Sequence, residues 1–137
     1  MGTASARIGL IRLAGVTFDT GALIAIERGE PRLQALLDEA SVAGADIAVP
    51  AGVIAQAWRG SLRQARLARF LALKIVTAVP LDEAEARATG ALCGRTGTSD
   101  VVDASVVICA RGRGHMVVTG DRDDLAALDP ALGLVEL

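Results

Sequence analysis

The stretch GVTFDTGALIA, residues 15–25, decides the fold. Its first part, Val16–Phe18, favours a strand, and the apolar residues after Thr20 recur at the spacing of a helix. Asp19 therefore lies where a strand ends and a helix begins. Ligands of α/β proteins bind at this edge of the sheet, so Asp19 is a candidate site residue. Helix capping is the alternative interpretation of a single acid at this position.

Five strands are predicted from the same patterns, at residues 16–18, 46–49, 74–79, 116–119 and 132–137. Helices are predicted between them, at residues 20–27, 31–43, 50–60, 61–73, 81–92, 101–110 and 121–128. The order βααβααβααβαβ, with mostly short loops, implies a parallel sheet covered by helices. We therefore expect an α/β fold of three layers, with a parallel sheet of about five strands between two layers of helices.

The length of 137 residues is most simply one domain, residues 1–137. Hydrophobic residues make up 52% of the chain, but each apolar run is interrupted before the ~18 residues typical of a membrane span. This surplus predicts an interface, so we expect a homodimer that does not contact a membrane. Residues 1–14 lack the pattern of a signal peptide, and we expect a cytoplasmic protein with a loosely ordered or partner-contacting leader. Cys93 and Cys109 lack CxxC spacing and are expected to be reduced.

The charges are segregated along the chain, although the net charge is only −2. Residues 100–129 hold six acids. Residues 47–81 hold no acid and five bases, which are Arg59, Arg63, Arg66, Arg69 and Lys74. The negative net charge argues against a general nucleic-acid-coating protein. The segregation predicts instead that one part of the surface meets phosphates and another gathers cations.

Two acids begin the very apolar helix predicted at residues 101–110. Asp100 and Asp103 are three residues apart, so both lie on one face of the helix start. Asp100, or its neighbour Ser99, suits a helix cap. Asp103 is too deep in the helix for that role, and a carboxylate in an apolar setting needs a positive or hydrogen-bonding partner. We therefore expect Asp103 to meet a metal or another partner.

Asp121 follows a predicted strand as Asp19 does, which places both acids on one edge of a parallel sheet. A solvated helix start is the alternative interpretation, and it accounts for Asp123. Convergence of Asp19, Asp103, Asp121 and Asp124 would be repulsive without divalent cations between them. Carboxylate oxygens without nearby His or Cys favour Mg²⁺ or Mn²⁺ over zinc.

Four segments carry a resemblance to a known family: FDTGALIA, VPAGVIAQAWRG, TSDVVDASVVICA and VVTGDRDDL, in this order and spacing. The chain resembles the PIN-domain ribonucleases, and among them the VapC-type toxins of bacterial toxin–antitoxin pairs. The resemblance implies a five-stranded parallel fold, usually dimeric, with an acidic pocket for Mg²⁺ or Mn²⁺. It makes Asp19, Asp103 and Asp121 the first, third and fourth acids of the site, with Asp100 and Asp124 as neighbouring metal ligands.

Gln56 departs from the family pattern, because the family usually has a Glu at this position. Its amide supplies an oxygen but no charge, and it cannot act as a base.

With these acids and Gln56, the expected activity is endonucleolytic RNA cleavage by metal-activated water. A cognate antitoxin is the expected protein partner.

The chain has no Tyr, one Trp and two Phe, so it lacks the stacking platform of single-strand binders. RNA affinity is therefore expected from phosphate contacts of Arg59, Arg63 and Arg66, and it should be sensitive to salt. A solvated helix face, or pairing with an acidic antitoxin tail, explains these arginines equally well.

An Asp after the first strand also fits a phosphotransfer protein. A haloacid-dehalogenase-like phosphatase needs a second Asp where this chain has Gly21, and a response-regulator receiver needs an Asp after the third strand, where KIVTAVP has none. The serious alternative is a non-catalytic module that binds antitoxin or RNA and has lost turnover through Gln56. The sequence identifies neither the RNA nor the antitoxin.

Overall fold

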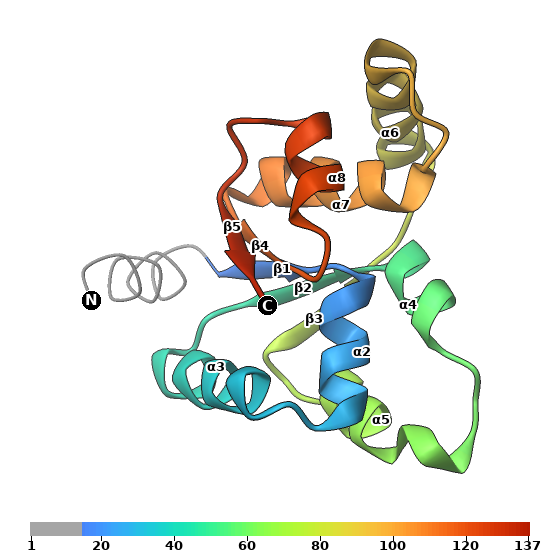
Figure 1. Ribbon diagram of the computed structural model, residues 1–137. Helices are drawn as coiled ribbons and strands as arrows, with labels where there is room; N and C mark the ends of the chain where they lie inside the picture. The colour runs from blue at the N-terminus through green and yellow to red at the C-terminus, as the bar shows by residue number, and fades with distance from the viewer. Residues whose placement is uncertain (1–14) are drawn as a thin grey trace.

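The structure is a computed structural model and describes residues 15–137, so the expectation for residues 1–14 lies outside the described residues. Five strands form one parallel sheet in the order β3-β2-β1-β4-β5 (Figure 1). They are β1 (Val16–Phe18), β2 (Ile47–Pro50), β3 (Val76–Val79), β4 (Met116–Thr119) and β5 (Leu134–Glu136). The predicted parallel α/β fold is confirmed.

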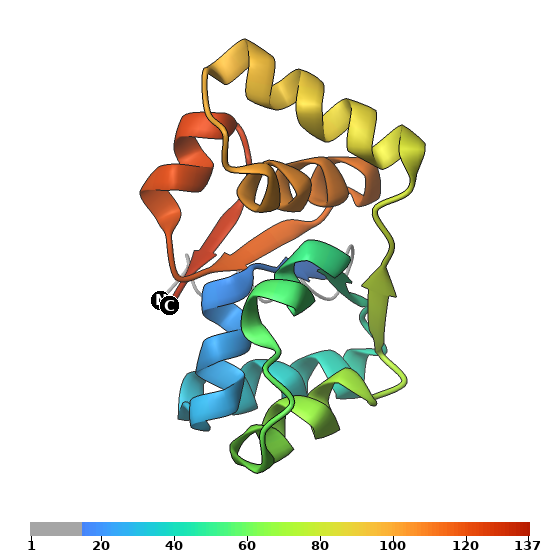
Figure 2. The same ribbon diagram turned by 90° about the vertical axis from the view of Figure 1, so that its right-hand side faces the viewer.

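Helices cover both faces of this sheet. They are α2 (Thr20–Arg28), α3 (Pro31–Ala43), α4 (Ala51–Ala57), α5 (Ala65–Leu71), α6 (Glu83–Thr96), α7 (Val101–Arg113) and α8 (Arg122–Leu128). Helices α6, α7 and α8 lie on one face, and α2, α3 and α5 lie on the other (Figures 1 and 2). Helix α4 contacts both α2 and α7, so it bridges the two helical layers.

Strands β1 and β2 are buried throughout, which is why their sequences are continuous apolar runs. On one face, Phe18 of β1 stacks on Phe70 of α5 with ring centroids 5.3 Å apart. On the other, α7 buries Ala104, Val106 and Val107, as expected for a nearly central helix. Both cysteines are free, Cys109 buried and Cys93 half-buried. Among the described residues, no helix has the length and hydropathy to span a membrane.

The segment between α4 and α5 differs from the two continuous helices expected there. Helix α4 ends at Ala57, and the next turn is a short 3-10 helix, η1 (Leu62–Gln64). The side chain of Gln64 is buried because its oxygen accepts from the N–H groups of Arg59 and Gly60, while its amide donates to the carbonyl of Ala57. These bonds satisfy the loop backbone and so replace helical turns.

Candidate active site

Asp19 joins the end of β1 to the start of α2. Its carboxylate accepts the N–H of Ala22 at 2.9 Å, so it caps α2 as one interpretation of the sequence proposed. It also accepts the N–H of Gly120 at 3.4 Å and the hydroxyl of Thr119, both from the end of β4. Asp19 is only 3% exposed, and this burial raises its pKa against the lowering effect of these hydrogen bonds. The acid therefore ties two sheet-edge junctions together.

Two glycines allow these junctions to approach each other. A Cβ added to Gly21 would lie 2.9 Å from the Cα of Gly120, and one added to Gly120 would lie 3.2 Å from the Cα of Gly21. A side chain at Gly21 would therefore push the start of α2 away from the turn between β4 and α8. This contact places the segment that carries Asp19 directly beside the one that carries Asp121.

Three carboxylates converge in front of this contact. Asp103 comes from the first turn of α7, Asp121 precedes α8, and Asp124 lies in its first turn. Each offers one oxygen, and these oxygens all lie within 4.8 Å of one another. The carboxylate of Asp121 also accepts the N–H of Asp124 at 3.5 Å. We call these three residues the acid trio.

The charges of the site oppose ionisation of Asp103. Partial burial first, then the charge and hydrogen bond of Asp100, and then the weaker effects of the Asp121 and Asp124 charges together raise the pKa of Asp103 to about 7. The pKa of Asp124 is also raised, first by its hydrogen bond with Asp121 and then by the charge of the same residue. Such a site gains stability when a cation neutralises the carboxylates.

Asp100 caps α7, since its carboxylate accepts the N–H of Asp103 at 3.0 Å. Its own N–H donates to the hydroxyl of Thr98 at 3.1 Å. Both residues line a cavity of about 190 Å³, together with Thr96, Asp103, Asp124, Ala127 and Leu128. The space beside Asp103 and Asp124 is therefore lined by hydroxyl and carboxylate oxygens.

Gln56 lies on α4 and joins the site through Thr20, the first residue of α2. The hydroxyl of Thr20 donates to Oε1 of Gln56 at 2.6 Å. Because Thr20 directly follows Asp19, this bond brings Gln56 beside the first acid. The structure thus draws the four sequence segments together at the carboxyl edge of the sheet.

The three candidate arginines lie between the end of α4 and the first turn of α5. Arg66 of α5 donates to the carbonyl of Glu27 at 3.5 Å, near the C-terminal end of α2. Nine residues of helix separate that end from Asp19 by about 13 Å. Arg59 donates to the carbonyls of Ala55 and Trp58 at the end of α4. Arg63 is exposed on η1. Their role in binding RNA stays a prediction.

Three of the five acids expected to be metal ligands form the trio, namely Asp103, Asp121 and Asp124. Asp19 lies deeper and Asp100 caps α7, and neither is a member of the trio. The trio consists only of hard carboxylate oxygens, which fits Mg²⁺ or Mn²⁺ better than zinc. The donor set of this chain therefore suits the cation that the sequence predicted.

Several residues that build the site were not identified from the sequence. They are Thr20, Gly21, Thr98, Thr119 and Gly120. Thr119 accepts the N–H of Asp121 at 2.7 Å and donates to Asp19, so it links two acids. The sequence does contain a pattern that could have indicated four of these residues. Asp, Thr and Gly occur together both at residues 19–21 and at residues 119–121.

The chain is similar to known proteins over most of its length. Residues 16–129 match the family described as PIN domain. VapBC2 from Rickettsia felis, bound to a DNA fragment from its promoter, is similar with a TM-score of 0.68 and 16% identity, covering 89% of this chain and 98% of that chain. A toxin–antitoxin complex from Klebsiella pneumoniae is similar with a TM-score of 0.66 and 19% identity, covering 89% and 99%.

FitAB bound to an IR36 DNA fragment is a third similar structure, with a TM-score of 0.64 and 16% identity, covering 88% of this chain and 94% of that chain. No curated protein matches the sequence significantly. At these identities the solved structures show a shared fold, while the family match extends over most of the sequence and includes all of the acids described above. The chain therefore belongs to the PIN domain family.

Proposed function

We propose that this protein is a Mg²⁺- or Mn²⁺-dependent endoribonuclease toxin of the VapC type, neutralised by a cognate antitoxin. The observation that carries the proposal is the acid trio at the carboxyl edge of the sheet, where three oxygens lie within 4.8 Å. PIN domains are generally nucleases, and the similar solved structures include a toxin–antitoxin complex. An endoribonuclease that is toxic to its own cell needs such a partner.

The residues divide the work of phosphodiester hydrolysis. Asp103, Asp121 and Asp124 would hold the cation, which supplies Lewis acidity to activate water and offsets charge on the phosphate. Asp19 holds the two acid-bearing junctions together through Gly120 and Thr119. Asp100 fixes the start of α7 and so the position of Asp103.

The substrate proposed is RNA, with its phosphates contacted by the basic segment around η1. Arg59 and Arg63 are exposed there, and Arg66 lies on the neighbouring turn. Phosphate contacts of this kind carry no sequence information by themselves. They would extend the path of the RNA from the acid trio along α4.

A hollow at the end of α2 far from Asp19 suits the antitoxin. It has a volume of about 840 Å³ and lies between the end of α2, α3 and α5. Its lining includes the apolar side chains of Leu33, Leu37 and Phe70, the arginines Arg66 and Arg69, and the acids Glu30 and Asp38. We propose that an amphipathic antitoxin segment occupies this hollow, because its apolar face would complement the apolar lining and its charges would pair with side chains of both signs.

Exposed apolar residues support the proposal of a homodimer. Val101 is 54% exposed and Leu81 is 49% exposed, both in the half of the molecule that carries α6 and α7. A stable dimer would bury at least about 1,000 Å² in total. We also propose a cytoplasmic location, where both cysteines remain reduced.

Cleavage of a fluorescent single-stranded RNA tests the nuclease proposal. Activity should require Mg²⁺ or Mn²⁺, disappear with EDTA, and fall at least about 100-fold in Asp103→Asn. Asp123→Asn is the matched control, because Asp123 lies in the first turn of α8, between Asp121 and Asp124, but is not part of the acid trio. Cleavage that persists in EDTA, or that both variants reduce equally, would contradict the proposal.

The alternative, a non-catalytic module that binds antitoxin or RNA, rests on Gln56 in place of Glu. It predicts no cleavage by the parent or by Asp103→Asn, with binding of the antitoxin unchanged in both. The same assay separates the two functions, since only the nuclease makes cleavage depend on the acid trio.

A further inference from the structure

The orientation of the Gln56 amide follows from its contact with Thr20. The hydroxyl oxygen of Thr20 lies 2.6 Å from Oε1 of Gln56. This distance is typical of an O–H donor to an oxygen, and it is short for an N–H donor, for which about 2.9 Å is usual. The carbonyl side of the amide therefore faces Thr20, and Nε2 faces away from it.

The N–H donors of the Gln56 amide are not used by the described part of the protein. Nε2 carries two N–H donors, and within residues 15–137 it donates to no protein group. The side chain is exposed, so these donors are open to a ligand. By contrast, Oε1 already accepts the proton of Thr20, which leaves it less available to a cation.

An amide here changes what the site attracts. A Glu could accept the Thr20 proton with one oxygen and direct its second, charged oxygen to a cation. Gln56 has N–H groups in place of that second oxygen, and N–H groups repel cations and bind anions. Cation binding is then left to the acid trio, whose carboxylates come from α7 and α8 rather than from α4.

We propose that Gln56 is a phosphate-binding residue, whose Nε2 donates to a non-bridging oxygen of the RNA backbone, and that Thr20 fixes its orientation. The proposal rests on the proposed function, because it assigns the substrate contact of the same site. Where the family usually has a Glu, this chain then has a residue that contacts the substrate.

Three variants test this role. Gln56→Met keeps the length of the side chain and removes its polar groups, Gln56→Glu keeps its shape and replaces the donors by a charged acceptor, and Thr20→Val frees the amide to rotate. Each is measured for Mn²⁺ affinity without RNA, by the signal of free Mn²⁺ in electron paramagnetic resonance, and for KM and kcat with a fluorescent single-stranded RNA. Thermal unfolding confirms that each variant is folded.

Gln56→Met should raise KM about tenfold, the value of one hydrogen bond to a charged group, and leave Mn²⁺ affinity within about twofold of the parent. Gln56→Glu should bind Mn²⁺ more tightly and yet raise KM further, because a carboxylate repels the phosphate. Thr20→Val should raise KM by a smaller factor, about threefold, since the donors remain but are no longer oriented.

The opposite pattern would overturn the proposal. A Gln56→Met variant that loses Mn²⁺ affinity about tenfold at unchanged KM would make Gln56 a metal ligand through its carbonyl. A Gln56→Glu variant with a KM equal to or below that of the parent would show that the donors are unused. If the parent cleaves no RNA, the proposed nuclease activity fails, and the Kd of uncleaved RNA from fluorescence anisotropy takes the place of KM. Equal RNA affinity of the parent and Gln56→Met would then overturn the phosphate contact.

Discussion

Asp103 and Asp121 lie at the starts of two different helices, α7 and α8, and place carboxylate oxygens within 4.8 Å of each other. Asp124 offers a third oxygen within the same limit. Like charges at this distance repel each other, so the ionised site opposes the packing of α8 beside α7 when no cation is bound. The stability of the metal-free protein therefore depends on the protonation of this site.

The stability of the metal-free protein should depend on pH through Asp103. Burial and the charge of Asp100 raise the pKa of Asp103 from 3.8 to about 7. Between these two values the folded protein binds more protons than the unfolded chain, so the free energy of unfolding falls as pH rises through the window. In EDTA, we expect Tm to be higher at pH 5 than at pH 8, by a few degrees as an order of magnitude.

Asp103→Asn should weaken this pH dependence and stabilise the metal-free protein at pH 8, because the amide has no charge to repel. Some dependence should remain, since the pKa values of Asp19 and Asp124 are also raised. Asp123→Asn serves as the control and should keep the slope of the parent. Equal slopes for all three proteins, measured by thermal unfolding in EDTA, would show that Asp103 ionises normally.

The second prediction concerns Gly21. Gly21→Ala places a Cβ 2.9 Å from the Cα of Gly120, and backbone atoms cannot move aside as a flexible side chain can. We expect a loss of about 2 kcal/mol in the free energy of unfolding, the usual cost of overpacking. Weaker Mn²⁺ binding should accompany it, because the junction that carries Asp121 is displaced.

Gly90→Ala on α6 is the matched control, since a Cβ at Gly90 meets nothing within 4 Å. Alanine favours a helix over glycine, so this variant should gain about 0.5–1 kcal/mol. Urea unfolding measures both changes. If the two variants have the same stability, the contact between Gly21 and Gly120 is not tight in solution.

Local patterns were sufficient to predict the order of the elements and the edge of the sheet that carries the acids. Asp19 and Asp121 each follow a strand, and parallel strands share a carboxyl edge. The depth of each acid was not predictable in this way. Asp19 is buried because Gly120, 101 residues further along the chain, donates to it. Such a bond depends on the packing of β1 beside β4, which no local pattern contains.

The break between α4 and α5 has a similar cause. The residues at Gly60 and Ser61 indicated a stop, but the predicted helices on both sides were too long. Gln64 is polar and would be expected on the surface, yet it is 5% exposed because it bonds the loop backbone and the carboxylate of Glu27 on α2. The loop conformation is thus set by a side chain whose partners lie on another helix.

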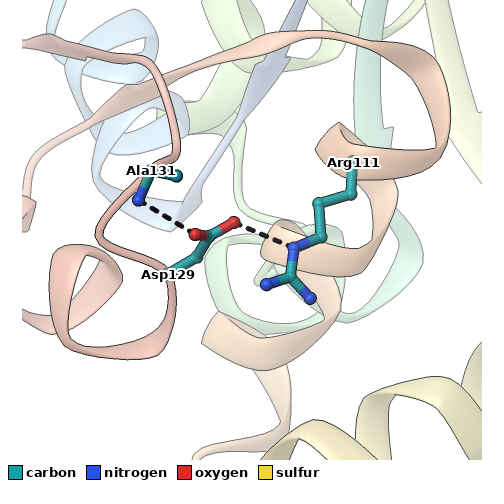
Figure 3. Close-up of polar contacts among 3 residues, drawn as sticks. All are labelled: Arg111, Asp129 and Ala131. Carbon is teal, nitrogen blue, oxygen red and sulfur yellow. Dashed lines mark hydrogen bonds and ion pairs between the residues drawn. The ribbon is translucent and has the colours of Figure 1, made fainter.

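The third prediction concerns the ion pair between α7 and the loop after α8 (Figure 3). The Nε of Arg111 donates to Asp129 at 2.8 Å, and the other carboxylate oxygen accepts the N–H of Ala131 at 3.0 Å. The Asp129 side chain is only 12% exposed. Arg111→Met would leave this carboxylate with the backbone donor alone, so we expect a loss of about 1 kcal/mol in the free energy of unfolding.

Arg87→Met is the control for that loss. Arg87 pairs with Glu83 on α6 at 2.8 Å, but the two side chains are 80% and 79% exposed. An exposed pair of this kind contributes at most about 0.5 kcal/mol. Both losses in the free energy of unfolding are measured by urea unfolding. Equal losses for Arg111→Met and Arg87→Met would contradict a greater contribution of the partly buried pair to stability.

The last prediction separates the two interpretations of the arginines near η1. Each phosphate contact to single-stranded RNA should contribute about 0.7 to the slope of log Kd against log salt concentration. Arg63→Ala should therefore weaken RNA binding and reduce the slope by about 0.7, since Arg63 is exposed and holds no other group in the described structure. Arg87→Ala, on α6 in the opposite helical layer, should leave the slope unchanged. If Arg63 binds the antitoxin instead, Arg63→Ala should show the same slope for RNA as the parent. Its complex with the antitoxin should then be weaker than that of the parent and less sensitive to salt.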